Sequence, residues 1–158
     1  MKKQQLFGLV LGVIAVVLLA LAAVLIFRDG RIVLSAEYRG DGGIGTITID
    51  ELRTMTEEKK SFILFVSQPE CKTAEHLRGI LQELISEYPV QIFEVSFSDL
   101  KNSGLADEVR FYPSLVIYRQ GKIADFLDAN DDADTEAYNS LGGLKAWLTN
   151  VVILDYKK

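Results

Sequence analysis

An uninterrupted apolar run over residues 6–27 constrains this chain more than any other feature, because it contains no charged side chain and none of the usual polar ones. A helix of about 20 apolar residues is long enough to cross the hydrocarbon core of a bilayer. Within that core a single segment satisfies its backbone hydrogen bonds only as a helix. The run therefore predicts a transmembrane anchor over residues 6–27, with residues 1–5 as a short N-terminal flank.

A cleaved signal peptide is the alternative to an anchor, since such peptides also carry an apolar core and end at small residues. Ala20-Leu21-Ala22 fits that pattern of small residues. However, residues 23–27 continue the apolar run, so cleavage after Ala22 would leave an apolar new N-terminus. An uncleaved anchor is the favoured interpretation.

The charges beside the run predict its orientation. Lys2 and Lys3 precede it, whereas Arg28 and Arg31 follow it with Asp29 between them. Because positively charged flanks stay in the cytoplasm, we expect residues 1–5 to be cytoplasmic and the anchor to cross the cell membrane once. The body of the chain would then lie on the extracytoplasmic side, with membrane lipid as the partner of the anchor.

Composition excludes several classes of partner and site. The 158 residues carry a formal net charge of -5 and include one cysteine and one histidine. An acidic balance argues against binding nucleic acid, which requires a basic face. One cysteine excludes an internal disulfide, and one cysteine with one histidine cannot provide the four ligands of a structural zinc site. We therefore predict no metal, no cofactor and no nucleic-acid partner.

A flexible linker is predicted over residues 28–46. Residues 38–45 are rich in glycine and lack apolar periodicity, which is typical of a segment that holds a domain away from the membrane. Within this segment, residues 32–34 are apolar and form either a short strand or a contact near the lipid headgroups. The ordered domain is expected over residues 47–158.

Helix and strand patterns alternate from residue 48 onward. Thr48 and Glu51 form a capping box that begins a helix, and Tyr88-Pro89 ends a later one. Residues 61–67 are almost continuously apolar, so they predict a strand buried on both faces. Further strands are expected over residues 90–97, 114–118 and 123–127, with a hairpin turn at Gln120-Gly121, and further helices after Cys71, over residues 103–109 and around residues 141–148. This order predicts an α/β fold with a mixed sheet.

The same order resembles the thioredoxin fold, and four stretches of sequence carry the resemblance. Residues 64–71 match the buried strand that leads into the Cys-x-x-Cys motif at a helix N-terminus, and residues 80–88 match the tail of that helix. Residues 105–118 resemble the region around the family's cis-proline, and residues 119–122 resemble the hairpin after it. The resemblance covers about residues 47–148 and implies a three-layer α/β/α sandwich with a mixed sheet.

The chain departs from the family at the second cysteine. Residues 71–74 read Cys-Lys-Thr-Ala, so Ala74 stands where the resolving cysteine belongs, and Phe65 stands where thioredoxins place a buried acid. A second register aligns residues 69–72 with the family's Gly-Pro-Cys-Lys and makes Cys71 the resolving residue. That register shifts the helix by three residues and loses the match at Tyr88. Both registers leave one thiol.

The resemblance implies that Cys71 is the catalytic nucleophile. A helix N-terminus favours a thiolate by roughly 0.3–1 kcal/mol, and Lys72 adds a positive neighbour. A thiolate can attack a disulfide and form a mixed disulfide. The resemblance also implies that Pro113 is cis and that Tyr112, Pro113 and Lys72 border the groove for the substrate.

Two functions stay open at this point. The first is thiol–disulfide exchange on a secreted or surface protein or peptide that carries a thiol or a disulfide. Small exported proteins of this type resemble the thioredoxin-like accessory proteins of bacteriocin export. The second is a redox-inactive thioredoxin-fold module that binds a partner or serves as an accessory subunit in a membrane or export assembly.

Overall fold

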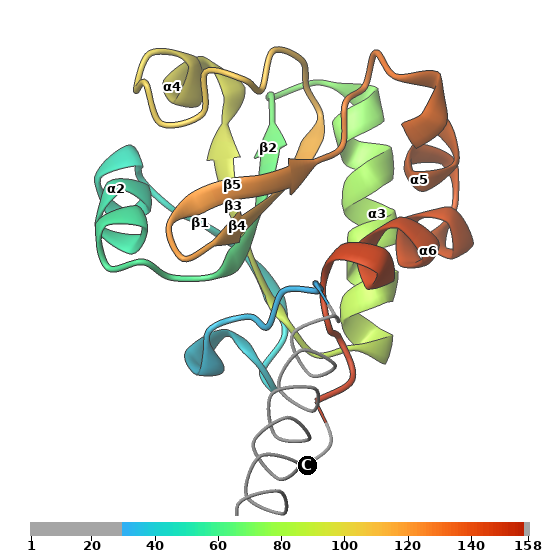
Figure 1. Ribbon diagram of the computed structural model, residues 1–158. Coiled ribbons are helices and arrows are strands. Elements are labelled where there is room, and N and C mark those ends of the chain that lie inside the picture. The colour runs from blue at the N-terminus through green and yellow to red at the C-terminus, as the bar shows by residue number, and fades with distance from the viewer. Residues whose placement is uncertain (1–29, 157–158) are drawn as a thin grey trace, which may run out of the picture. The chain divides into compact units, whose positions relative to one another are not determined.

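The computed structural model describes residues 30–156, which form a sheet with helices packed on both sides (Figure 1). The compact unit that contains these elements begins at Arg31. The predicted N-terminal flank and anchor, residues 1–27, lie outside the described residues. Within residues 30–156, none of the helices combines the length and the apolar character that a membrane span requires.

The sheet is mixed and has five strands in the order β1-β3-β2-β4-β5. Its three parallel members are β1, β3 and β2, whereas β4 runs antiparallel to β2 and β5 antiparallel to β4. The strands are β1 (Gly43–Thr46), β2 (Phe62–Ser67), β3 (Gln91–Ser96), β4 (Ser114–Arg119) and β5 (Lys122–Phe126). The predicted mixed sheet is therefore confirmed, with β1 as a strand that the sequence pattern did not reveal.

Five α-helices and two short 3₁₀ turns complete the described residues. The helices are α2 (Ile49–Glu57), α3 (Lys72–Glu87), α4 (Phe97–Lys101), α5 (Thr135–Asn139) and α6 (Leu141–Val151), and the 3₁₀ turns are η1 (Ala36–Tyr38) and η2 (Asp132–Asp134). The predicted capping box of α2 is present, because the Glu51 amide donates to Thr48 Oγ1 at 3.2 Å and the Thr48 amide donates to Glu51 Oε2 at 2.7 Å.

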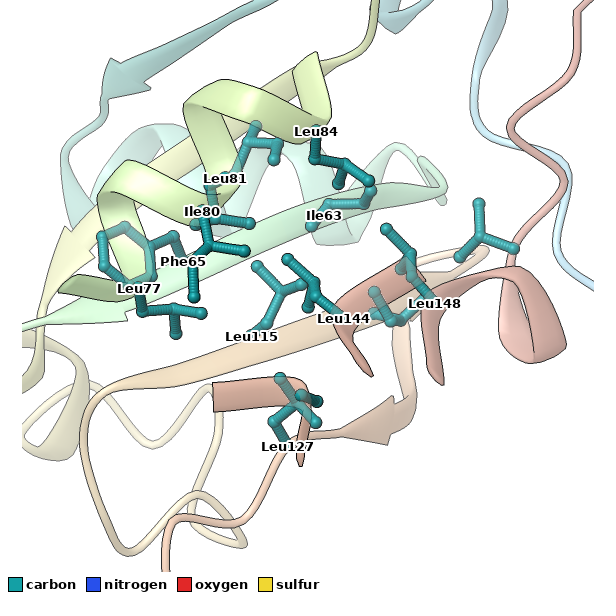
Figure 2. Packing of buried hydrophobic residues seen from close by; sticks show 14 of the residues in the cluster. Ile63, Phe65, Leu77, Ile80, Leu81, Leu84, Leu115, Leu127, Leu144 and Leu148 are labelled. Carbon is teal, nitrogen blue, oxygen red and sulfur yellow. The ribbon is translucent and has the colours of Figure 1, made fainter. Parts of the chain in front are cut away.

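Each face of the sheet packs its own apolar core, which follows from the alternation of side chains along a strand. On one face, Ile63 and Phe65 of β2 pack with α3, α5 and α6 (Figure 2). On the other face, Phe62, Leu64 and Val66 of β2 pack with α2 and α4. Strand β2 is buried along its whole length, as its continuous apolar run predicts.

The flexible linker predicted over residues 28–46 is wrong from Arg31 onward. Ile32 forms a parallel bridge with Val152, donating its amide to Val151 O at 2.7 Å and accepting from the Ile153 amide at 2.9 Å. Leu34 is fully buried in the core beside α3 and α6. The glycine-rich stretch supplies β1, which pairs with β3. Glycine content indicated flexibility, but non-local backbone pairing and burial order these residues.

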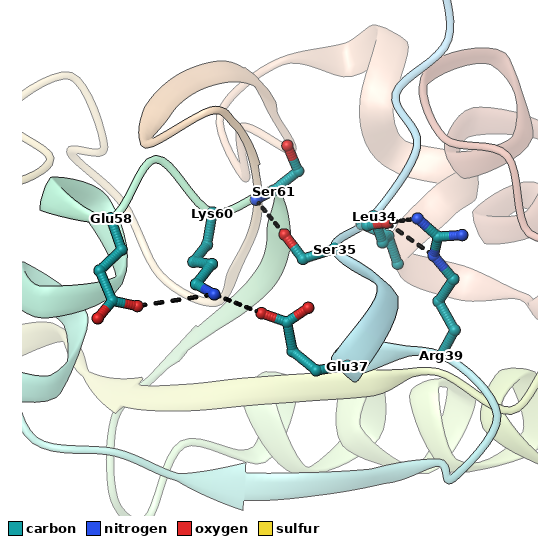
Figure 3. A network of polar contacts seen from close by, with 7 residues as sticks. All are labelled: Leu34, Ser35, Glu37, Arg39, Glu58, Lys60 and Ser61. Carbon is teal, nitrogen blue, oxygen red and sulfur yellow. Dashed lines mark hydrogen bonds and ion pairs between the residues drawn. The ribbon is translucent and has the colours of Figure 1, made fainter.

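Polar contacts also tie this segment to the start of β2 (Figure 3). Lys60 Nζ lies 2.6 Å from Glu37 Oε1 and 3.7 Å from Glu58 Oε2. The Ser61 amide donates to Ser35 Oγ at 2.9 Å, and Ser61 Oγ accepts from the Gln120 amide at 3.0 Å. Two distant segments, residues 35–37 and the turn at Gln120, are therefore hydrogen-bonded to the end of the sheet at which β2 begins.

The helix predicted over residues 103–109 is also wrong. The helical turns lie earlier, in α4, and residues 103–109 form turns. Ser103 Oγ donates to Leu100 O at 2.7 Å and accepts from the Leu105 amide at 3.1 Å, while Gly104 adopts a φ of 69°. A serine that bonds nearby backbone groups, followed by a residue of positive φ, ends a helix.

Candidate functional site

Three connecting segments leave the same edge of the sheet. Ser67, the last residue of β2, is the register partner of Ser96, the last residue of β3. Ser114, the first residue of β4, is the partner of Val66. The segment after β2, the start of α4 and the segment before β4 therefore meet at the carboxyl ends of β2 and β3. This edge carries the site residues predicted from the sequence.

A tight turn positions Cys71. The Cys71 amide donates to Gln68 O at 3.3 Å, and Glu70 adopts a φ of 63°. Proline in the second position and a positive φ in the third are features of a type II turn. Cys71 itself has an extended backbone and is the N-cap of α3, whose first turn it begins by accepting the Glu75 amide at 3.0 Å. The predicted placement at a helix N-terminus is confirmed.

The surroundings of Cys71 differ from those of a two-cysteine site. Cys71 is partly buried and packs against the core beside α3. Ala74, one turn further along, is 3% exposed. A methyl group thus occupies the position from which a second thiol would reach Cys71, and the chain has no other cysteine.

Pro113 has the geometry that the resemblance implies, since the Tyr112–Pro113 peptide bond is cis. The side chain is buried. The Tyr138 hydroxyl lies 2.9 Å from Pro113 O and 3.1 Å from Leu127 O, and Ser114 Oγ donates to Leu127 O at 2.7 Å. Contacts from α5 and from Leu127, the residue after β5, therefore hold the segment before β4 in place.

Phe111 and Tyr112 precede Pro113 in the chain, and with Phe97, which contacts Tyr112, they are what we call the aromatic patch. Phe111 is 46% exposed and Tyr112 is 41% exposed. The Tyr112 and Phe97 rings are in contact, with centroids 4.8 Å apart. Because exposed apolar side chains that occur together, unlike single ones, mark binding sites, the patch is a candidate binding surface.

A cavity of about 270 Å³ lies beside Cys71. It is lined by the end of β2, the turn before α3, one side of α3 and one side chain of β3: Ser67, Gln68, Pro69, Glu70, Cys71, Ala74, Glu75, Arg78 and Glu94. The structure thus places Cys71 in a cavity that Tyr112, Pro113 and Lys72 do not line. Lys72 is exposed at the first position of α3.

Glu94 and Arg78 form an ion pair at this cavity. Arg78 Nη1 donates to Glu94 Oε2 at 2.8 Å, and Nη2 bonds the other carboxylate oxygen. Ser67 Oγ donates to Glu94 Oε1 at 2.5 Å, and the guanidinium lies 5.3 Å from the centroid of the Phe65 ring. Glu94 is only 8% exposed. Burial opposes ionisation most strongly, but the bonds from Arg78 and Ser67 outweigh it and hold the pKa of Glu94 below its usual value.

Glu94 is not among the site residues predicted from the sequence, although the sequence carries a signal for it. Val90, Ile92 and Glu94 alternate along the strand and therefore point to the same face. Val90 and Ile92 belong to the core of that face. An acid in such a series is expected to be buried and therefore paired. Phe65, which stands where thioredoxins place an acid, is the direct register partner of Glu94.

No protein-family model matches this chain, and no curated protein matches it. Solved structures do. Thioredoxin O1 from Arabidopsis thaliana superposes with a TM-score of 0.53 at 13% identity, over 71% of this chain and 100% of that one. Mitochondrial thioredoxin 3 from Saccharomyces cerevisiae superposes with a TM-score of 0.51 at 14% identity, over 68% of this chain and 95% of that one.

The chain has a thioredoxin-like fold. A mutant thioredoxin from Halobacterium salinarum agrees, with a TM-score of 0.50 at 12% identity over 73% of this chain and 95% of that one. At these identities the similarity shows the fold alone. What distinguishes this thioredoxin-like domain is its single cysteine, at the N-terminus of α3.

Proposed function

We propose that this protein is a membrane-anchored, extracytoplasmic thioredoxin-like protein whose Cys71 exchanges disulfides with a secreted or surface partner. The observation that carries the proposal is the position of Cys71, which is partly exposed, caps α3 and lines a cavity. The unpaired amides of a helix N-terminus stabilise an anion there, and the thiolate is the attacking species in disulfide exchange.

The reaction needs no group beyond the two partners. The Cys71 thiolate attacks one sulfur of a partner disulfide, so that a Cys71–partner disulfide forms and the partner's own S–S bond breaks. The displaced sulfur leaves as a thiolate and takes a proton from water. The number of disulfides is unchanged, so the step requires no oxidant or reductant.

Release of the partner cannot come from this chain, because Ala74 occupies the position of a resolving cysteine. A second thiol on the same partner, or a low-molecular-weight thiol, attacks the mixed disulfide and frees Cys71. The mixed disulfide should therefore be long-lived, and this favours isomerisation or capture of partners over rapid turnover.

The aromatic patch and Pro113 would hold the partner segment. The patch is exposed, and the segment that carries it is anchored through Tyr138 and Ser114. A fixed apolar surface at the same end of the sheet as the nucleophile suits an extended segment that brings its disulfide to Cys71. Lys72 would contribute a positive charge at the edge of the same groove.

The membrane location rests on the apolar run over residues 6–27 and on Lys2 and Lys3 before it. An extracytoplasmic domain also fits a role on disulfides, which persist in oxidising compartments. A reporter that is active only outside the cytoplasm, fused after Lys158, should give signal. Activity only from a cytoplasmic reporter at the same position would overturn the location.

The redox role is tested by trapping. Cells that produce the protein should show adducts of higher mass on non-reducing gels, and these adducts should disappear with a reductant and in Cys71→Ser. His76→Gln is a suitable control, since His76 is exposed on α3 and does not line the cavity. Absence of adducts under oxidising stress would remove the redox role.

A second candidate is a redox-inactive binding or accessory module of a membrane or export assembly, as in the accessory proteins of bacteriocin export. The absence of a resolving thiol together with the exposed aromatic patch favours it. Under this role a Phe111→Ser/Tyr112→Ser variant should lose its partner while Cys71→Ala keeps full function. Under the redox role, Cys71→Ala should lose function.

A further inference from the structure

We infer that the outer edge of β1, together with an apolar hollow beside it, binds an extended, basic segment of another protein, which adds a strand to the sheet. The hollow is a cavity of about 400 Å³ on the face of the sheet that α2 covers. None of its lining residues lines the cavity beside Cys71. The inference therefore goes beyond the proposed function and does not depend on the thiol.

Strand β1 lies at one edge of the sheet and offers hydrogen-bonding groups to a further strand. The amides of Gly43 and Ile47 donate to backbone carbonyls of the β3 segment at 3.3 Å and 2.9 Å. Because the backbone groups of alternate residues in a strand point in opposite directions, the amides and carbonyls of Ile44 and Thr46 point away from β3. Within residues 30–156, β3 is the only strand that pairs with β1.

The other edge strand, β5, has features that discourage such pairing. It carries the charged residues Lys122 and Asp125, and its pairing with β4 is interrupted by a register shift. Charged side chains and bulges are means by which edge strands avoid adding a further strand. Strand β1 has neither, since it contains no charged residue and pairs with β3 in unbroken register. Of the two edges, β1 is therefore the one open to a partner.

The hollow lies where β1 has no side chain. Gly45 is the register partner of Phe93, which is only partly buried although β3 is an interior strand. Tyr38, Ile47 and Met55 form the rest of the apolar lining. Neighbouring strands lie about 4.8 Å apart, so an aromatic side chain of an added strand can lie across Gly45 and contact Phe93. Aromatic residues cover glycines in paired strands in this way.

The charges at the hollow favour a basic partner. In the described part of the chain, its charged lining residues are Asp50 and Glu51, which are exposed and have no ion-pair partner within 4 Å. Lysine or arginine two positions from the aromatic residue of the partner would point to the same face and complement these carboxylates. A second copy of this chain would bring the same two acids to the interface, and repulsion between like charges disfavours it.

The test measures binding of short, fluorescein-labelled peptides to the full chain in detergent by fluorescence anisotropy. The lead peptide has a central phenylalanine, lysine two positions away on either side and threonine elsewhere, so the ring and both lysines share one face. One version replaces phenylalanine with serine, and another replaces both lysines with glutamate. Two further versions carry N-methyl groups on alternate amides, one on the odd and one on the even positions.

We expect the lead peptide to bind on the order of tenfold more tightly than the serine version, because the ring loses its burial there. It should bind at least about threefold more tightly than the glutamate version, as expected for exposed charge pairs. One N-methylated version should lose binding and the other should keep it, because an added strand pairs with β1 through one of its two edges.

Thr46→Pro removes an outward amide and no bond to β3, so it should weaken binding on the order of tenfold in a folded domain. Thr46→Val keeps the amide and is the matched control. Gly45→Val places a side chain next to Phe93, and only the end of the Gln91 side chain lies within 4 Å of the added Cβ. This variant should therefore abolish the preference for the phenylalanine peptide over the serine one. Circular dichroism checks the fold of each variant.

The proposal is overturned if the lead peptide binds no more tightly than about 1 mM, or if both N-methylated versions bind equally well. Undiminished binding by folded Thr46→Pro and Gly45→Val would overturn it as well. A dimer in sedimentation experiments that Thr46→Pro disrupts and Thr46→Val preserves would assign the edge to a second copy instead. Cys71→Ser should bind the lead peptide like the unchanged protein, so a failure of the disulfide chemistry leaves this site standing.

Discussion

The two faces of the sheet differ in what they bury. The face covered by α2 and α4 is apolar, and it contains the stacked Phe62 and Tyr118 rings, whose centroids are 4.5 Å apart. The face covered by α3 and α6 is equally apolar along most of its length but buries Glu94 near the carboxyl end of β3, where Cys71 also lies. A charge inside a core costs stability unless it is paired. The apolar face is therefore held by burial alone, whereas the opposite face also depends on the pairing of Glu94 with Arg78 and Ser67.

The largest effect is expected from Phe62→Ala on the apolar face. Phe62 is fully buried and stacks on Tyr118. Removing the ring should cost about 3–5 kcal/mol of unfolding free energy, because lost burial and a cavity add together. Urea denaturation followed by circular dichroism gives the value. A cost below about 1 kcal/mol would show that this face is not closely packed.

A smaller loss is expected from Arg78→Met on the opposite face, since it leaves the Glu94 carboxylate buried without its cation. Breaking a buried pair costs about 3–5 kcal/mol, but Arg78 is 36% exposed and water screens it, so about 1–2 kcal/mol is expected at pH 7. The double variant Arg78→Met/Glu94→Leu should recover most of the loss. A double variant as unstable as the single one would contradict this account of the pair.

The same variant predicts a pH dependence. The folded pKa of Glu94 lies below its usual value, so in the native protein this group adds stability above its unfolded pKa of about 4.3 and loses it as the pH falls through the folded value. Arg78→Met removes that contribution. The difference in unfolding free energy between the two proteins should therefore be full at pH 7 and shrink in acid. A difference that stays constant from pH 7 to pH 3 would exclude Glu94 as its source.

Tyr138→Phe should cost about 0.5–1.5 kcal/mol, because it removes one buried hydrogen bond. The Tyr138 hydroxyl lies within hydrogen-bond distance of Pro113 O and Leu127 O. In the variant, Ser114 Oγ still donates to Leu127 O. The change loosens the segment that carries Tyr112, so partner capture should fall by more than stability alone explains. Capture at a temperature where both proteins are fully folded measures this. If Tyr138→Phe captures its partner as well as the unchanged protein does, the segment that carries Tyr112 does not bind the partner.

The smallest effect on stability is expected from Cys71→Ala, at about 0.5 kcal/mol, since a partly buried sulfur contributes little area to the core. Thermal melts of the two proteins give the difference. Nearly equal melting temperatures, together with complete loss of the mixed-disulfide adducts, would show that Cys71 acts as a nucleophile and is not needed for packing. A loss above about 2 kcal/mol would assign it to packing instead.

Much of the fold followed from local patterns. The apolar run of residues 61–67 predicted a fully buried strand, the Thr48–Glu51 pair predicted a capped helix, and Gln120-Gly121 predicted the hairpin. Each of these signals is read within a few residues, so distant parts of the chain do not alter it. The position of Cys71 at the start of α3 was predictable for the same reason.

The misplaced elements depend on distant partners. The stretch that forms β1 contains two glycines in four residues, and only pairing with β3 makes it a strand. Ile32 and Leu34 looked equally suited to a membrane surface until the bridge with Val152 placed them in the domain. The misplaced helix over residues 103–109 has a local cause instead. Its apolar side chains follow a helical pattern, but Ser103 bonds nearby backbone groups and Gly104 adopts a positive φ, so these residues form turns.

The sequence by itself determined the class of the fold, the single thiol, the missing resolving cysteine and the apolar run that predicts an anchor, because composition and short-range periodicity carry this information. Tertiary structure alone decided which charges meet. Arg78 and Glu94 are sixteen residues apart and on different elements, and Gln68 Oε1 is buried from solvent although its side chain is polar. Pairing and desolvation depend on distances between side chains in space, and those distances exist only once the sheet and α3 have packed together.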